Sequence, residues 1–197
     1  WSYLLVVFIF VFIPLLEHVL HLNPSNYSEE EKEKRLKDKL YDWLLYINLL
    51  IVYGCLYYTF QTIEKKPLAP YEIVGIVLSL GIILGSNGIN VAHELGHRKK
   101  LYERILGKIL LVPSHYTHFF VEHNHGHHLD VSTPEDPSTA KYNQNLYSFW
   151  LQSVSGTYVK AWKIQKKLNK INKTPFFSLK NLVFLPKENE KVGKFFF

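Results

Sequence analysis

The sequence contains a single cysteine and no methionine. One thiol excludes an intrachain disulfide, a CxxC redox pair and a zinc site built from several cysteines. Cys55 lies inside an apolar stretch, where we expect it to be a small buried apolar residue. Because even the first residue is not methionine, we expect the chain to be a piece of a longer protein.

The chain also lacks the marks of two classes of protein that its composition would allow. A net charge of +6 and a pI near 9.2 would suit nucleic-acid binding, but the basic residues are in short stretches that flank apolar blocks. The apolar opening, residues 1–22, lacks the basic start and the small-residue cleavage site of a signal peptide. We therefore expect no nucleic-acid partner and no cleaved leader here.

Long apolar blocks dominate the rest of the sequence. These blocks are residues 1–20, 41–60, 71–92, 102–121 and 146–162. A helix needs roughly 20 apolar residues to cross a hydrocarbon core, and the first three blocks approach that length. The fourth is interrupted by Pro113, and the fifth is amphipathic and runs into a basic stretch that suits a membrane surface. The pattern predicts an all-α, multi-pass transmembrane bundle with about four hydrophobic helices, forming one integral-membrane domain over residues 1–197.

The distribution of lysine and arginine predicts an orientation in the membrane. Residues 32–39 and 98–108, which follow the first and third blocks, are rich in lysine and arginine, whereas the connection after the second block has only Lys65 and Lys66. Loops rich in these residues stay on the cytoplasmic side. The segment after the third block should therefore face the cytoplasm.

Six histidines form two clusters on that side. The first cluster is the sequence HELGH, and the second is HNHGHH. Residues four apart share one face of a helix, so each cluster can present a pair of histidines, and a further histidine adjoins the second pair. Imidazole suits zinc, copper, iron and nickel. The predicted metal ligands are His93, His97, His123, His127 and His128.

HELGH alone also matches the HExxH pattern of zinc proteases, in which the glutamate acts as a general base. Intramembrane proteases of this kind take a third ligand from a later Leu-Asp-Gly context, which does not occur here. A site with one zinc ion does not explain the histidine-dense second cluster. Two metal ions explain it better.

The stretches HELGHRKKLYERILGKILL and HYTHFFVEHNHGHHLDVSTPEDPSTA resemble the membrane-bound alkane 1-monooxygenases. These belong to the histidine-rich, integral-membrane di-iron superfamily that also contains fatty-acid desaturases. The resemblance extends from the first apolar block to about residue 175. The final residues, 185–197, match nothing in that family, and the family's further histidine motifs, an EHYG-like segment and an HSDHH-like box, are absent from this chain.

The resemblance implies a site of two iron ions that activates O2 and hydroxylates the terminal C–H bond of a medium-chain alkane or related fatty chain. It implies electrons from a rubredoxin and its reductase, and a multi-pass location in the bacterial inner membrane with the histidine clusters facing the cytoplasm. The five histidines above match the family's ligands. His125 stands where the family usually has lysine or arginine, and we do not expect it to bind metal.

Neighbouring polar residues are candidates to orient the ligands, because a metal-bound histidine usually donates its other N–H to a carboxylate or carbonyl group. These candidates are Glu94, His118, Glu122, Asp130, Glu135 and Asp136. Three other functions stay open: a desaturase or lipid hydroxylase of the same superfamily, an intramembrane zinc protease, and a metal-binding membrane fragment without activity.

Overall fold

The computed structural model describes residues 2–20, 26–65, 67–176, 178 and 181, and the unmatched tail at 185–197 lies outside them. Within these residues every regular element is helical and no strand occurs, as the sequence predicted. The chain divides into two compact units, Trp1–Val91 and Ala92–Phe197. Each unit is described by itself.

The first unit opens with a short apolar helical run. It consists of α1 (Leu4–Val7), the π-helical turn η1 (Phe8–Phe12) and α2 (Ile13–Val19). Pro14 stands in the first turn of α2, and proline has no N–H to give to the preceding turn. A wider π-turn directly before it is one way a helix absorbs such a gap.

A solvated helix then leads into the longer ones. Helix α3 (Glu29–Lys37) begins at Ser28, whose hydroxyl accepts the Glu31 amide while the Glu31 carboxylate accepts the Ser28 amide. This reciprocal pair is a capping box and satisfies two amides at the helix start. The mixed-charge run is therefore an exposed helix, as its alternating signs indicate.

Two helices are long and apolar enough to cross a membrane. They are α4 (Lys39–Lys65) and the continuous helix Pro70–Gly96, which comprises α5 (Pro70–Ile83), η2 (Leu84–Asn90) and α6 (Val91–Gly96). Only 6% and 11% of their most apolar windows are buried within the structure. Core helices of a soluble protein would be mostly buried, so these apolar surfaces indicate a membrane location.

A polar contact joins these two apolar helices inside the first unit. The Asn87 side-chain amide donates to Asn48 Oδ1 at 2.7 Å, and Asn87 lies in the π-helical turn η2. Hydrogen bonds between membrane helices help to fix which faces meet. The first and fourth apolar blocks do not form long helices: Leu4–Val19 is shorter, and the fourth block ends its helix at Leu111 before Pro113.

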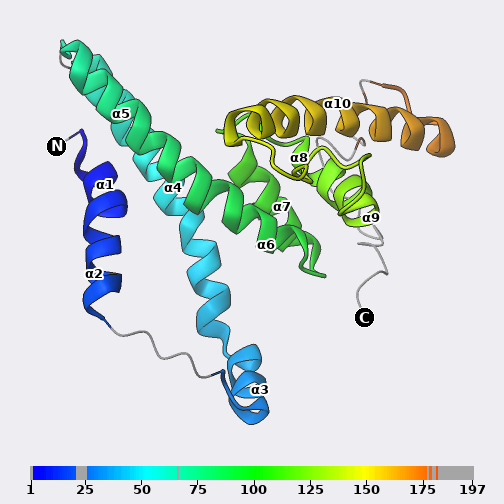
Figure 1. Cartoon of the computed structure of the whole chain (residues 1–197), viewed down its shortest axis with the longest axis horizontal. Coiled ribbons are helices and arrows are strands. Elements are labelled where there is room, and N and C mark those ends of the chain that lie inside the picture. Colours follow the sequence, from blue (N-terminus) through cyan, green and yellow to red (C-terminus); the bar gives the residue numbers. More distant parts are fainter. Residues whose placement is uncertain (1, 21–25, 66, 177, 179–180, 182–197) are drawn as a thin grey trace. The chain divides into compact units, whose positions relative to one another are not determined.

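The second unit carries the histidines. After α6 come α7 (Leu101–Leu111), α8 (Phe119–Glu122), η3 (His123–His127), α9 (His128–Asp130) and α10 (Leu146–Asn172). Helix α10 lies across α8 and η3 (Figure 1), and its Trp162, Ile164 and Leu168 pack around the buried Val121. The amphipathic block and the basic stretch after it are thus one 27-residue helix that covers the second histidine cluster.

Candidate metal centre

A π-helical turn sets the geometry of the second histidine cluster. Residues 123–127 form η3, in which each turn holds more residues than an α-helical turn. As a result His123 and His128, five apart, bring their Nε2 atoms to 3.0 Å. His123 and His127 are four residues apart, and their rings are stacked with centroids 5.4 Å apart. His123 and His127 thus share a face, and the Nε2 atom that lies closest to that of His123 within this cluster belongs to His128.

The two clusters meet through three Nε2 atoms. The Nε2 atom of His93 lies 2.7 Å from that of His123, and the Nε2 atom of His97 lies 3.0 Å from His93 and 3.1 Å from His123. His93 belongs to α6 and His97 directly follows it, whereas His123 begins η3. His93 and His97 of HELGH therefore converge, as their spacing of four predicted. His123, which follows α8 at the start of η3, brings its Nε2 atom next to theirs.

These distances fit a shared metal ion. Two nitrogens bound at about 2.1 Å and at right angles about one ion would lie roughly 3.0 Å apart. Three imidazoles at such distances cannot all donate to one another, since a neutral ring has only one N–H. A cation among the three lone pairs removes that conflict, and iron is among the metals that imidazole suits.

His127 has a different partner. Its Nδ1 atom lies 2.9 Å from Oδ2 of Asp136, whose side chain is fully buried. Asp136 also accepts hydrogen bonds from the Thr139 hydroxyl at 2.6 Å and from the Ser138 amide at 3.0 Å. A carboxylate bound to Nδ1 fixes the tautomer of the ring and leaves Nε2 with its lone pair, which is the usual arrangement of a metal-bound histidine.

Three of the predicted ligands have lowered pKa values. Burial, followed by the nearby histidines, lowers the pKa of His123 to about 2. Burial likewise lowers the pKa of His97 and of His128, and neighbouring histidines add to the effect. Because only a neutral imidazole has a lone pair for a metal, these shifts keep the donors available at neutral pH.

Asp136 remains an anion beside this cluster. Burial alone would raise the pKa of Asp136. The hydrogen bonds from Thr139, Ser138 and His127 outweigh burial and hold that pKa below its usual range. An ionised carboxylate is the stronger acceptor for the His127 N–H.

The other candidate orienting residues have different partners. Glu94 pairs with Arg98 at 3.1 Å, and about half of its side chain is exposed. Glu122 and Asp130 both face Lys160. His118 is buried against the rings of Tyr116 and Tyr158, and burial lowers its pKa.

Glu135 also stays apart from the histidine rings. Its carbonyl oxygen accepts a hydrogen bond from the Lys160 ammonium at 3.2 Å. Of the six residues considered from the sequence, the structure therefore brings Asp136 into hydrogen-bond contact with a predicted ligand.

Two residues near the site, Phe119 and Lys160, were not among the candidates predicted from the sequence. The Phe119 ring stacks on the His123 imidazole, with centroids 4.8 Å apart and planes 20° apart. Lys160 lies 37 positions after His123 in the sequence, yet contacts both Glu122 and Asp130. Phe119 precedes His123 by four residues, and this helical spacing could have predicted the contact between the two rings. Nothing local marked Lys160 among the many lysines of its helix.

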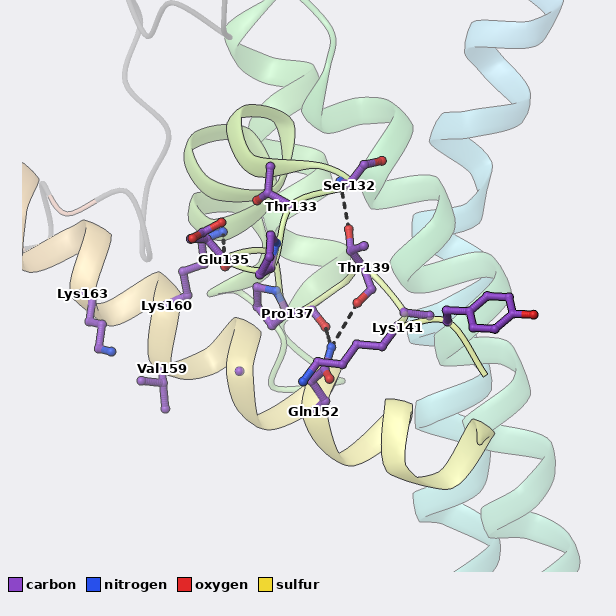
Figure 2. Close-up of a pocket in the computed structure, with 14 residues that line it drawn as sticks. Ser132, Thr133, Glu135, Pro137, Thr139, Lys141, Gln152, Val159, Lys160 and Lys163 are labelled. Atoms are coloured by element: carbon purple, nitrogen blue, oxygen red, sulfur yellow. Dashed lines mark hydrogen bonds between the residues drawn. The ribbon is translucent and has the colours of Figure 1, made fainter. Parts of the chain in front are cut away.

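A cleft with a mixed polar and apolar lining adjoins the Asp136 loop. It has a volume of about 710 Å³ and runs between residues 132–142 and α10 (Figure 2). Lys141, Lys160 and Lys163 line it together with hydroxyl groups.

The chain matches one protein-family model and is similar to several curated proteins. The family model for fatty acid desaturase matches residues 70–188. The chain is 34% identical over 187 residues to alkane 1-monooxygenase 1 of Alcanivorax borkumensis, covering 94% of this chain and 46% of that protein. It is 37% identical over 155 residues to an alkane 1-monooxygenase of Pseudomonas putida, covering 79% of this chain and 38% of that protein.

A protein of lower similarity is also named as a monooxygenase component. The hydroxylase component of a xylene/toluene monooxygenase from Pseudomonas putida is 29% identical over 114 residues, which cover 58% of this chain and 31% of that protein. The chain therefore spans about half the length or less of the curated relatives it matches. All three regions of similarity are with proteins named for monooxygenase chemistry.

Proposed function

Because the chain belongs to the fatty acid desaturase family, we propose that it is part of a membrane-bound non-haem di-iron monooxygenase. Its substrate would be a medium-chain alkane or a related fatty chain, hydroxylated at the terminal C–H bond with O2. The observation that carries the proposal is the convergence of the His93, His97 and His123 Nε2 atoms within 3.1 Å of one another. The relatives named alkane 1-monooxygenase support the choice of reaction.

The chain's own residues have distinct parts in this proposal. His93, His97 and His123 would hold one iron ion, while His128 and His127 would contribute to a second. Asp136 would orient His127 through Nδ1. When bound, iron supplies the activation of O2 that an amino-acid side chain cannot provide. The protein supplies the neutral donors, their spacing and a low-dielectric surrounding.

The proposal includes partners and a location. A rubredoxin and its reductase would deliver the electrons, and the chain would lie in a bacterial inner membrane with the histidines on the cytoplasmic side. The two apolar helices and the lysine and arginine bias of the connecting segments support this arrangement.

A desaturase or lipid hydroxylase is the second candidate, because the matched family model carries the desaturase name. The zinc-protease function has less support. Its mechanism needs the glutamate of HExxH beside the metal-bound water. Glu94 is instead paired with Arg98 and is half exposed.

Metal analysis of the full-length protein in detergent tests the proposal. The expected result is about two iron ions per chain, with half or more lost in His123→Ala, and turnover of octane when rubredoxin and its reductase are added. His125→Ala is the matched control from the same turn and should retain its iron. One zinc ion per chain, unchanged in His123→Ala, would overturn the proposal in favour of a protease.

A further inference from the structure

Lys160 contacts both ends of the segment that carries the second histidine cluster. Its ammonium nitrogen lies 3.7 Å from Oε1 of Glu122, the residue before His123, and 2.8 Å from Oδ2 of Asp130, two residues after His128. Glu122 is almost fully buried, with its side chain 1% exposed. Burial raises the pKa of Glu122, and the nearby Lys160 ammonium opposes that shift by favouring the charged carboxylate.

The same ammonium reaches the loop that carries Asp136. It donates a hydrogen bond at 3.2 Å to the carbonyl oxygen of Glu135, the residue before Asp136 (Figure 2). Asp136 in turn binds Nδ1 of His127. The Lys160 side chain on α10 therefore touches the residue before η3, the last residue of α9 and the loop that orients His127.

The aliphatic part of Lys160 lies directly against the histidine turn. A Cβ atom added at Gly126 would come within 3.1 Å of Lys160 Cε and 2.9 Å of Glu122 Oε1. No side chain other than hydrogen fits there without displacing these groups, so α10 approaches the backbone of η3 at this glycine. The lysine stem and its charge both contact the segment that presents the donors.

Neighbouring positions of α10 act on the same loop. Gln152, eight residues before Lys160, donates from Nε2 to the carbonyl oxygens of Pro137 and Thr139, at 3.1 Å each. Gly156, midway between them, lies against Pro137. Residues at intervals of four lie on one helix face, and this face of α10 follows the loop on both sides of Asp136.

From these contacts we infer that Lys160 is a positioning residue of the metal site: it ties the histidine turn and the Asp136 loop to α10 and so sets where the second cluster's nitrogens lie. The inference rests on the proposed metal-binding function. The ionic contacts of Lys160 are to Glu122 and Asp130, so its expected effect is on the geometry of the segment that carries the histidines. Replacing residues that orient metal ligands typically lowers metal affinity by about 10- to 100-fold.

The test compares Lys160→Met, Lys160→Arg and Lys163→Met in the full-length protein in detergent. Methionine removes the charge but keeps much of the stem, and arginine keeps a cation of similar reach. Lys163, on the next turn, is exposed and lines the same cleft. The readouts are the affinity for Fe(II) or Co(II), and the visible absorption of the Co(II) form, which reports the ligand geometry. Thermal unfolding is measured in parallel.

We expect about a tenfold loss of affinity and a changed Co(II) spectrum in Lys160→Met. Lys160→Arg should recover most of both, and Lys163→Met should match the unaltered protein. A Lys160→Met protein that unfolds at lower temperature but keeps its affinity and spectrum would overturn the positioning role and leave the proposed function standing. An unaltered protein that binds no metal would overturn both.

Discussion

At the scale of single residues, one buried carboxylate distinguishes the site from a mere gathering of histidines. Asp136 is ionised, accepts three hydrogen bonds and holds the His127 ring by Nδ1. A histidine fixed in this way presents Nε2 without rotational freedom, which lowers the entropic cost of binding a metal.

Asp136→Asn should lower the affinity for iron by about 10-fold or more. The amide keeps the shape of the side chain but removes the charge that favours the His127 N–H. Glu94→Gln is the control, because Glu94 pairs with Arg98 on an exposed face. Titration of the metal-free proteins with Fe(II) measures the iron affinity of the Asp136→Asn and Glu94→Gln variants. Equal affinities for Asp136→Asn and the unaltered protein would show that the hydrogen bond does not orient a ligand.

The lowered pKa values predict how the metal-free protein responds to acid. The unfolded chain protonates its histidines as the pH falls through about 6.5, whereas folded His97, His123 and His128 bind protons only at lower pH because burial lowers their pKa values. Protons then bind the unfolded state preferentially, so the free energy of unfolding decreases from that pH downward. The loss for each histidine is at most about 1.4 kcal/mol per pH unit.

Denaturant unfolding in detergent, after chelation of metal, measures this effect at about pH 7.5 and about pH 5.5. His123→Ala should lose less stability between the two conditions than the unaltered protein, since one buried neutral imidazole is gone. A protein that is equally stable at both values would contradict the neutral cluster.

At the scale of elements, contact between α10 and the loop after α9 matters as much as the histidine turn itself. A Cβ atom at Gly156 would lie 2.5 Å from Cβ of Pro137, whose ring cannot move aside freely. The glycine therefore allows α10 and the loop beside Asp136 to approach closely.

Gly156→Ala should destabilise the protein and displace that loop. Overpacking of this kind costs about 1–3 kcal/mol, from which the better helix propensity of alanine subtracts roughly 1 kcal/mol. Ser155→Ala, one position earlier on the exposed face, is the matched control and should be near neutral. Thermal unfolding in detergent compares them, and an unchanged midpoint in Gly156→Ala would contradict the close contact.

At the scale of the whole molecule, two long apolar helices with little internal burial require a surrounding of low polarity. The charge bias of the connections then predicts which ends face the cytoplasm. Residue 99 follows the helix that ends in HELGH, and residue 65 ends the preceding helix α4. The two positions should lie on opposite sides of the membrane.

Single cysteines test this orientation in a Cys55→Ser background. Lys65→Cys should react with a membrane-impermeant maleimide in intact spheroplasts, whereas Lys99→Cys should react only after the membrane is permeabilised. Both side chains are exposed in the structure, so a difference reflects sidedness. The reverse pattern would place the histidines on the outer side.

Features that depend on neighbours along the chain could be predicted from the amino-acid sequence. Apolar length predicts helices for residues 41–60 and 71–92 because a helix is defined by local hydrogen bonds. The spacing of His93 and His97 predicts their convergence for the same reason, and their nitrogens lie 3.0 Å apart. The family was likewise recognisable from short motifs, and the family model matches residues 70–188.

The remaining features depend on contacts between residues that are far apart in the chain. The approach of the His128 Nε2 atom to that of His123 occurs across the π-helical turn, which the spacing of the histidines did not predict. Which nearby carboxylate orients a ligand depends on the path of the loop to Asp136, and that path follows the face of α10 that carries Lys160. These contacts join residues far apart in the chain, and no local pattern specifies them.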